Sequence, residues 1–426
     1  MKRNNLTIVL GVVIILSTLI FTSCEEEYPD PLWPGDNPDG GPAPTITSVT
    51  PSDTAWTDAD TVIIVGTNFS DDIGSMHVAF GGVRGQIVAS TTTQLSILPP
   101  TNFKDSLTIK IDRSGENGTL TFAEYYPYFL KNPFSKPGDP IFAEVDMIYG
   151  IAADNEGNVF LSSAILNASD VSSKKIIKLL PNGDRIDDWS KTATNKGVAM
   201  RMGPNGNLFY MNYNAGGWIS KTDTLTGGTD YGQLGTATFD LDFDSNGNLF
   251  YVGEDAIYKV DPSDLSVSEL AMDYTDYKLK AARVYNGNLY VGSVYIGTDT
   301  LLTGQKIWKH SIASDGSLGS QQEVVDWTSK YSSIISALEF DEYGNMFVGT
   351  VSTADIESDG IIKISASGIH SYFYPQLLRG DITYSVYKMT WTGNYMYCSI
   401  RDGADASNNT IIKLNMFSKS AEYHER

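Results

Sequence analysis

The sequence predicts an all-β chain in which a β-sandwich is followed by a six-bladed β-propeller. Three observations predict it. A Gly-Asn turn followed by large apolar residues occurs six times, at intervals of 40 to 57 residues, which is the range of a propeller blade. Short alternating strands fill residues 44–130. The chain is also rich in the residues of turns and strands, with 39 Gly and 24 Tyr in 426 residues.

The Gly-Asn steps define the repeats of residues 147–426. Such a turn supplies the positive-φ positions of a tight hairpin, and a strand-like run follows each one. The six pairs are Gly157-Asn158, Gly206-Asn207, Gly247-Asn248, Gly287-Asn288, Gly344-Asn345 and Gly393-Asn394.

A second landmark in each repeat is an apolar strand that carries a lysine. The six residues are Lys178, Lys221, Lys259, Lys309, Lys363 and Lys413. An alternating strand precedes each Gly and a further strand follows the lysine, so each repeat has four strands. The first and last repeats match the interior ones, which favours a closed ring over a capped solenoid. The order of landmarks resembles NHL repeats. We expect the lysines to serve the packing of the repeat, because third strands lie away from the axis.

Residues 44–130 contain the motifs of the predicted sandwich. The strand Val62–Val65 continues into Gly66-Thr67-Asn68-Phe69, and Val78-Ala79-Phe80 is followed by Gly81-Gly82. Pro44, Pro51 and Pro99-Pro100 flank these strands. This pattern resembles the IPT/TIG domain, an immunoglobulin-like fold. The resemblance implies a spacer or interaction module, and we expect a spacer. Residues 131–146 read as a Pro-containing linker to the propeller.

The N-terminus predicts export and lipidation. Lys2 and Arg3 precede the apolar run 6–20, which is short for a membrane span. The run ends at Phe21-Thr22-Ser23-Cys24, which resembles the lipobox of bacterial lipoproteins. The resemblance implies a signal peptide over 1–23, acylation (palmitate) of Cys24 and an anchor in the cell outer membrane. An ordinary secretory peptide is the alternative.

Residues 24–43 are predicted to be an acidic, Pro- and Gly-rich tether. Glu25–Glu27 resemble the signal that sends lipoproteins of Bacteroidetes to the cell surface, and a solvated charge run is the alternative. The whole mature chain resembles Bacteroidetes surface lipoproteins with an IPT/TIG domain and an NHL-like propeller. A formal charge of −21 argues against nucleic acid as a partner.

The sequence contains no clear catalytic or cofactor motif. Its four histidines form no HxxxH or HExxH pair, and neither GxSxG nor a P-loop occurs. Cys398 lies in an apolar strand, where an inert thiol is expected. No cofactor is predicted, although carboxylates could bind Ca²⁺.

We expect a functional site, if there is one, among the unequal loops at one mouth of the propeller. The candidate ligand-binding residues are Tyr213, Asn214, Trp218, Tyr295, Arg401 and Asp402. Aromatic faces with polar neighbours suit a sugar, so the leading hypothesis is a glycan-binding lipoprotein without catalysis. A hydrolase or lyase with a carboxylate or Ca²⁺ site in the channel is an alternative, as is a scaffold for outer-membrane protein partners.

Overall fold

The computed structural model describes most of the chain from residue 42 onward. The described residues are 42–101, 105–114, 120–137, 145–165, 175–191, 197–212, 217–223, 229–234, 238–265, 268–298, 304–353, 356–379, 384–401 and 409–422. They form two compact units. None of the described helices is long and apolar enough to cross a membrane. The predicted signal peptide 1–23, the tether up to residue 41 and Cys24 lie outside the described residues.

The N-terminal unit is a sandwich of two sheets, as predicted. One sheet has the order β1 (Thr45–Thr50), β3 (Val62–Thr67), β7 (Gln94–Leu98) and β6 (Gln86–Ser90). The other has the order β2 (Thr54–Trp56), β9 (Leu120–Lys131), β8 (Leu107–Ser114), β4 (Met76–Phe80) and β5 (Val83–Arg84).

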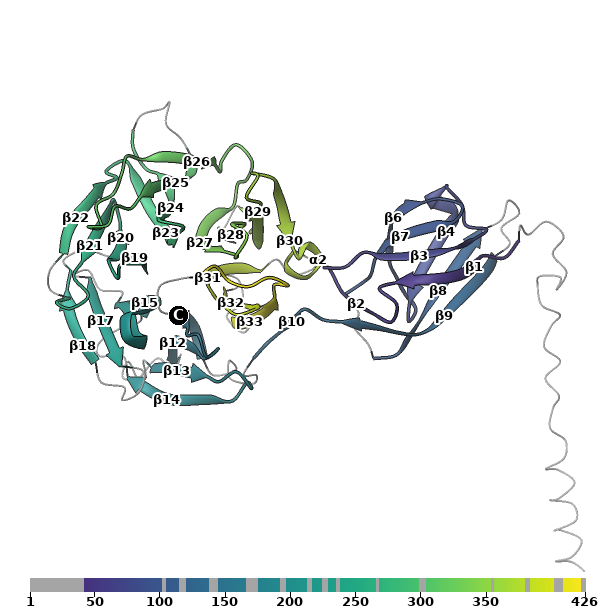
Figure 1. Cartoon of the computed structure of the whole chain (residues 1–426), viewed down its shortest axis with the longest axis horizontal. Helices are drawn as coiled ribbons and strands as arrows, with labels where there is room; N and C mark the ends of the chain where they lie inside the picture. The colour runs from purple at the N-terminus through teal and green to yellow at the C-terminus, as the bar shows by residue number, and fades with distance from the viewer. Residues whose placement is uncertain are drawn as a thin grey trace, which may run out of the picture. The chain divides into compact units, whose positions relative to one another are not determined.

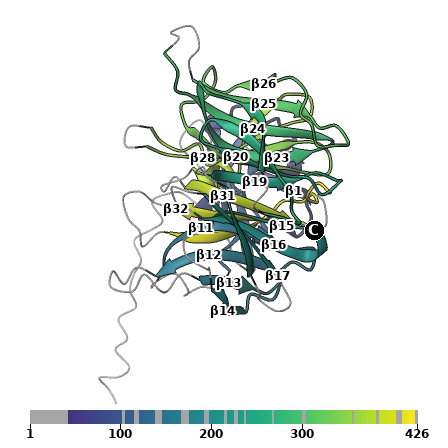
Figure 2. The same ribbon diagram turned by 90° about the vertical axis from the view of Figure 1, so that its left-hand side faces the viewer.

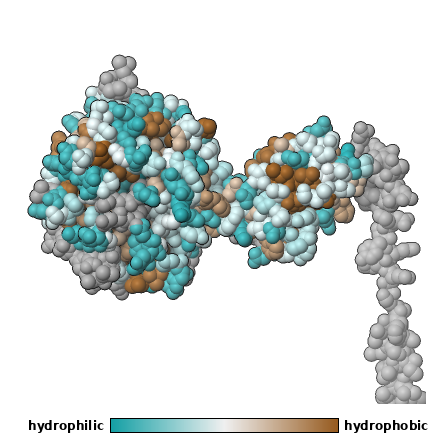
Figure 3. Space-filling model, viewed as in Figure 1, coloured by the Kyte–Doolittle hydropathy of each residue, from teal (hydrophilic) through white to brown (hydrophobic). Residues whose placement is uncertain are grey.

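Alternate residues of the sandwich strands form its core. In β4, for example, Met76, Val78 and Phe80 are fully buried while the residues between them are half-buried, which is the period of a strand with one face on a core. On the first sheet, Val65 and Val88 are exposed. Figure 3 shows an apolar patch on the sandwich surface over β3 and β7.

The C-terminal unit is a propeller of six sheets with four strands each, arranged around a common centre (Figure 1). Seen from the side, the strands run from one face of the ring to the other (Figure 2). The blades are β11 (Val145–Ala153), β12 (Val159–Ile165), β13 (Lys175–Leu179), β14 (Arg185–Lys191); β15 (Gly197–Gly203), β16 (Asn207–Asn212), β17 (Trp218–Asp223), β18 (Thr229–Gln233); β19 (Thr238–Phe243), β20 (Leu249–Gly253), β21 (Ala256–Val260), β22 (Ser268–Asp273); β23 (Tyr277–Tyr285), β24 (Asn288–Tyr295), β25 (Gln305–Ser311), β26 (Gln322–Asp326); β27 (Ile334–Phe340), β28 (Met346–Val351), β29 (Ile361–Ile364), β30 (His370–Phe373); and β31 (Ser385–Thr392), β32 (Tyr395–Arg401), β33 (Thr410–Asn415) with β10 (Phe134–Ser135).

The ring is closed by an early segment of the chain. The innermost strands β11, β15, β19, β23, β27 and β31 each contact the next, and β31 contacts β11. The last blade takes its outer strand from β10, where Phe134 pairs with Leu414 and Ser135 with Lys413. Asn415 N also donates to Pro133 O at 2.8 Å. Residues 134–135 therefore belong to the propeller, although the sequence presents 131–146 as a linker.

The Gly-Asn steps are the hairpin turns between the first and second strands of the blades. All six glycines have positive φ, between 53° and 83°. In three turns an aspartate four residues before the asparagine fixes the hairpin. Asp154 Oδ1 accepts from Asn158 N at 2.8 Å and Oδ2 from Asn158 Nδ2 at 2.7 Å. Asp244 and Asp341 hold Asn248 and Asn345 in the same way.

The repeated lysine of each third strand lies opposite the repeated aromatic residue of the second strand. The six pairs are Lys178–Phe160, Lys221–Phe209, Lys259–Phe250, Lys309–Tyr290, Lys363–Phe347 and Lys413–Tyr397. Lys178 Nζ lies 5.4 Å from the ring centroid of Phe160, and Lys363 Nζ 5.6 Å from that of Phe347, within the range of a cation–π contact. These two lysines thus contact their own blades, whereas Lys259 Nζ also donates to Asp315 O of the next blade at 2.6 Å.

Candidate functional site

One face of the propeller collects the starts of all six innermost strands. Because neighbouring strands of a blade are antiparallel, the loops between second and third strands share this face with the loops that join consecutive blades. We call this face the mouth. The Gly-Asn turns lie at the opposite face.

A cavity of about 200 Å³ lies at the mouth. Residues near the starts of the innermost strands of five blades line most of it, and Val351 at the end of β28 adds to its wall. The lining residues are Val198, Thr238, Phe239, Lys280, Ile334, Ile335, Ser336, Val351, Tyr387 and Lys388. Phe239 and Tyr387 supply ring surface, and the buried Thr238 Oγ1 has no hydrogen-bond partner among the residues that the structure describes. A concave, largely apolar site with a few polar groups is the usual form of a ligand pocket.

Lys388 forms the charged floor of this cavity. Its ammonium group donates to Phe239 O at 2.7 Å, and so joins the sixth blade to the third, which stands opposite in a ring of six. Burial lowers the pKa of Lys388 to about 8. The charge of Asp240 opposes this shift, whereas the charges of Arg201, Arg401 and Arg283 reinforce it.

A buried network of charges continues from Lys388 between the innermost strands. We call it the channel network, and its members are Arg201, Asp240, Asp242, Arg283, Glu339 and Lys388. Arg201 Nη2 lies 3.4 Å from Asp240 Oδ1, and Arg283 bridges Asp242 at 3.3 Å and Glu339 at 2.5 Å. Three basic and three acidic groups balance. Its members are at most 7% exposed, so the pairing compensates a large desolvation cost.

The carboxylates of the channel network are occupied by protein donors. Asp240 accepts from Ala282 N at 3.1 Å and Asp242 from Val284 N at 2.8 Å, each beside an arginine. Burial opposes ionisation of Asp240, but the charges of Lys388, Arg201 and Arg283 outweigh it and lower the pKa of that carboxyl. Over the described ranges, no group of three His, Cys, Asp or Glu side chains could hold a metal ion. Cys398 is fully buried, and burial raises the pKa of its thiol.

Of the three predicted ligand-binding residues that the structure describes, Arg401 is the one that lies beside the cavity. Its guanidinium carbon is 3.4 Å from the ring centroid of Tyr387 and 4.9 Å from that of Tyr149. Arg401 Nη2 donates to Ile148 O at 3.1 Å, while Nε is buried and has no hydrogen-bond partner in the described part of the chain. Burial lowers the pKa of the Arg401 guanidinium, and the two tyrosines oppose the shift.

The other predicted residues lie farther out or outside the described ranges. Trp218 is the first residue of β17, a third strand. Tyr295 ends β24 and packs edge-on against Tyr277, with ring centroids 5.3 Å apart. Neither residue lines the cavity. Tyr213, Asn214 and Asp402 lie outside the described residues, so their predicted role stays a prediction.

Sequence reasoning missed the residues of the innermost strands. The alternation that predicted these strands used apolar pairs such as Leu241 and Phe243 or Leu338 and Phe340, and the residues between them are Asp242 and Glu339. A charged residue in the middle of a predicted buried strand was therefore a signal in the sequence that could have indicated the buried charges. What the pattern could not show is that blades distant in sequence bring these charges together.

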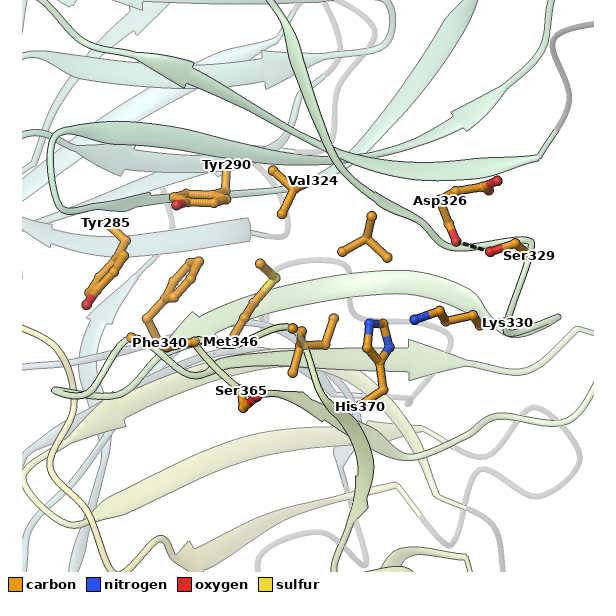
Figure 4. Close-up of a pocket in the computed structure, with 15 residues that line it drawn as sticks. Tyr285, Tyr290, Val324, Asp326, Ser329, Lys330, Phe340, Met346, Ser365 and His370 are labelled. Atoms are coloured by element: carbon orange, nitrogen blue, oxygen red, sulfur yellow. Dashed lines mark hydrogen bonds between the residues drawn. The ribbon is translucent and has the colours of Figure 1, made fainter.

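A second cavity, of about 400 Å³, lies between the fourth and fifth blades. Figure 4 shows Tyr285, Tyr290 and Met346 near one end, with Lys330 and His370 near the other. The ring of His370 stacks on Tyr331 and its Nδ1 lies 3.1 Å from Tyr331 Oη. Burial, and then the charge of Lys330, lower the pKa of His370. Its residues come from only two blades, in contrast to the five at the mouth.

Comparisons with known structures agree with this architecture. A protein from Bacteroides thetaiotaomicron that is named as a candidate phosphatase aligns with a TM-score of 0.50 and 10% sequence identity, over 90% of this chain and 98% of that one. An auxiliary nutrient binding protein from the same organism aligns with a TM-score of 0.49 and 11% identity, over 89% of this chain and 98% of that one. The calcium-binding protein regucalcin from Agrobacterium tumefaciens aligns with a TM-score of 0.48 and 14% identity, over 69% of this chain and 98% of that one. At these identities the likeness concerns the fold alone.

A search of curated proteins finds no match. The family model of the IPT/TIG domain matches residues 44–128, which confirms the prediction made from the motifs of the sandwich. The chain is therefore an IPT/TIG domain followed by a six-bladed β-propeller.

Proposed function

We propose that this chain is a lipoprotein of the outer membrane whose propeller binds a glycan at the mouth, without catalysis. The observation that carries the proposal is the mouth cavity, where the rings of Phe239 and Tyr387 adjoin polar groups. Aromatic faces stack on the C–H faces of sugars. The buried Thr238 Oγ1, for which the described ranges supply no hydrogen-bond partner, is a group that a sugar hydroxyl would satisfy.

The proposed membrane localisation rests on the N-terminal sequence. Acylation of Cys24 after removal of residues 1–23 would leave residues 24–43 as a tether, with the IPT/TIG domain as a spacer before the propeller. In cells, Cys24→Ser should abolish palmitate labelling and release the protein from the membrane fraction. Retention of the label in that variant would contradict the lipobox interpretation.

Binding without catalysis is favoured by the state of the channel carboxylates. Asp240, Asp242 and Glu339 each lie within 3.4 Å of an arginine nitrogen. A general acid needs a raised pKa and a carboxylate nucleophile needs access to the substrate. These groups are paired and buried instead, which supports a structural role for them.

A glycan panel tests the proposal. We expect the mature chain to bind at least one polysaccharide, and Phe239→Ala and Tyr387→Ala each to weaken binding about tenfold, because stacking contributes on the order of 1–1.5 kcal/mol. The matched control is Tyr343→Ala, which removes an exposed aromatic side chain (68% exposed) beside a Gly-Asn turn at the opposite face. Absence of binding across a broad panel, or equal loss in the control, would count against the proposal.

A further inference from the structure

We propose that the ligand of the mouth is an acidic glycan, whose carboxylate or sulfate groups are held by Lys280, Lys388 and Arg401. This inference rests on the proposed function and adds the chemical class of the sugar. Its basis is a concentration of cations in a chain whose formal charge is −21. The residues that line the cavity include two lysines and no aspartate or glutamate.

Lys280 is a cation that makes no direct ion pair within the described ranges. It is half-buried, its Nζ lies 5.6 Å from the ring centroid of Phe239, and it makes no ion pair with any residue that the structure describes. Lys278, two residues earlier on the same strand, lies over the same ring but pairs with Glu254 at 2.6 Å. Burial, and then the charge of Lys278, lower the pKa of Lys280, while the charge of Glu254 opposes the shift. Glu254 is in direct contact with Lys278, so Lys280 is the lysine of the two whose ammonium group has no carboxylate in contact with it.

Arg401 is the second such cation. It is half-buried, stacks on Tyr149 and Tyr387, and hydrogen-bonds to the Ile148 carbonyl and to the Tyr387 side chain. Among the described residues its Nε has no hydrogen-bond partner, and no carboxylate forms an ion pair with it. A guanidinium with unused N–H groups suits a planar carboxylate or a sulfate, which can accept two hydrogen bonds at once.

The channel network supplies no surplus negative charge at the mouth, because its three acids and three bases balance. Lys280 and Arg401 therefore add two positive charges beside the ammonium group of Lys388. Partly buried cations lack full hydration, so an anion that reaches them gains more than it would from exposed lysines. A neutral sugar could stack on the same rings but would leave these charges unpaired.

The experiment compares one sugar with and without its charge. Calorimetric titration of the mature chain uses trigalacturonate and its fully methyl-esterified form, which keeps the ring faces and removes the carboxylates. We expect the acid to bind at least tenfold more tightly, with an affinity that falls as salt is raised from 50 mM to 500 mM. A sulfated chondroitin oligosaccharide and its desulfated form, which share the same carboxylates, form a second arm. Loss of affinity on desulfation identifies sulfate as the anion, and equal affinity of the two forms, with weaker binding of the methyl ester, identifies carboxylate.

Two variants and one control connect the effect to the named residues. Lys280→Gln and Arg401→Gln should each weaken binding of the acidic sugar about tenfold. Lys363→Gln makes the same change in net charge on a third strand outside the cavity, and should leave the affinity unchanged. Thermal unfolding of each variant establishes that it is folded, and the comparison of acid with ester needs no variant.

The outcomes separate the two proposals. If acid and ester bind equally, or if Lys363→Gln weakens binding as much as Lys280→Gln does, the acidic ligand is wrong while glycan binding stands. If no sugar of the broad panel binds, whether neutral or acidic, the proposed function fails and this inference fails with it.

Discussion

Replacing Arg283 with methionine should be among the most damaging single changes in the propeller. Arg283 is fully buried and joins three of the innermost strands: it pairs with Asp242 on β19 and Glu339 on β27, and its Nε donates to Leu338 O at 3.0 Å. Methionine fills a similar length with apolar atoms. It would remove the Arg283 charge from both carboxylates, and Asp242 would keep only the longer contact with Arg201 Nε at 4.0 Å as an ion pair.

The size of the effect follows from this geometry. Removing one partner of a buried ion pair costs about 3–5 kcal/mol, mainly because the remaining charge is stranded. With an unfolding entropy of about 2.1 cal/mol/K per residue over a propeller of roughly 280 residues, that cost lowers its melting temperature by about 5–9 °C. Arg185→Met is the matched control, since Arg185 and Asp187 form an exposed pair at 2.6 Å. It should cost less than about 1 kcal/mol.

Differential scanning calorimetry of the mature chain measures both variants, because it resolves the propeller transition from that of the smaller domain when the two differ. The double variant Arg283→Met/Glu339→Met is the decisive comparison. It removes one stranded charge and should recover part of the lost stability. If Arg283→Met melts within 1 °C of wild type, or if the double variant is far less stable than the single one, the reasoning from stranded charge is wrong.

Three further predictions concern ring closure, the turns and pH. Phe134→Ala should destabilise the propeller by about 1–2 kcal/mol, because this half-buried ring packs on the core of the sixth blade; urea unfolding measures it. Gly157→Ala should cost about 1 kcal/mol in the same assay, because its φ is +83°. Affinity for an acidic sugar should fall as pH rises through about 8, where Lys388 loses its proton. A bound anion should move the midpoint of this loss to higher pH. Binding titrations at pH 6.5 and 9.5 measure the effect, and Lys388→Gln should reduce the difference between the two affinities.

Each of these has an outcome that contradicts it. A Phe134→Ala chain with the wild-type midpoint would mean that β10 does not support the ring. An unchanged midpoint for Gly157→Ala would mean that the turn tolerates a side chain at positive φ. Equal affinity at both pH values in the wild-type chain would show that the charge of Lys388 does not reach the ligand.

The fold was predictable from the sequence because its signals are local. A Gly-Asn hairpin and the aromatic and lysine residues of the next two strands sit within one blade, and each recurs in all six. A closed ring was predicted, but the strand that closes it was not predictable. Phe134 and Ser135 form a strand of only two residues with Pro133 before it and Pro137 soon after, so no alternation marks them. Their partners Leu414 and Lys413 lie at the far end of the chain.

The site was only partly predictable, for a similar reason. Loop lengths drew attention to Arg401, which the structure places beside the cavity. The same reasoning named Trp218 and Tyr295, which lie on third and second strands away from the lining. Loop length indicates which face of the propeller a residue is on, but not how far the residue lies from the propeller axis. Phe239 and Lys388, which do line the cavity, meet only because the third and sixth blades are opposite each other in the closed ring.

The contrast between repeated and unrepeated residues has a physical cause. In every blade the same cross-strand row contains an innermost residue, then the aromatic residue, then the lysine. The aromatic residue and the lysine are cross-strand neighbours within one blade, so the same pair can recur in all six blades. The innermost residues meet those of other blades. In chain order they are Ala152, Arg201, Asp242, Arg283, Glu339 and Thr390.

A single charged residue repeated at that position would bring like charges together in a buried ring, at a cost of several kcal/mol for each. Alternating signs from the second to the fifth blade remove that cost, since Arg283 then lies between Asp242 and Glu339. The first and sixth blades carry neutral residues there, and Lys388 joins from two residues earlier on β31. Variation between repeats at the axis is therefore imposed by closing the ring. Lys280 and Arg401 lie at the mouth, outside this row of alternating charges. Residues can therefore change there without placing like charges together at the axis.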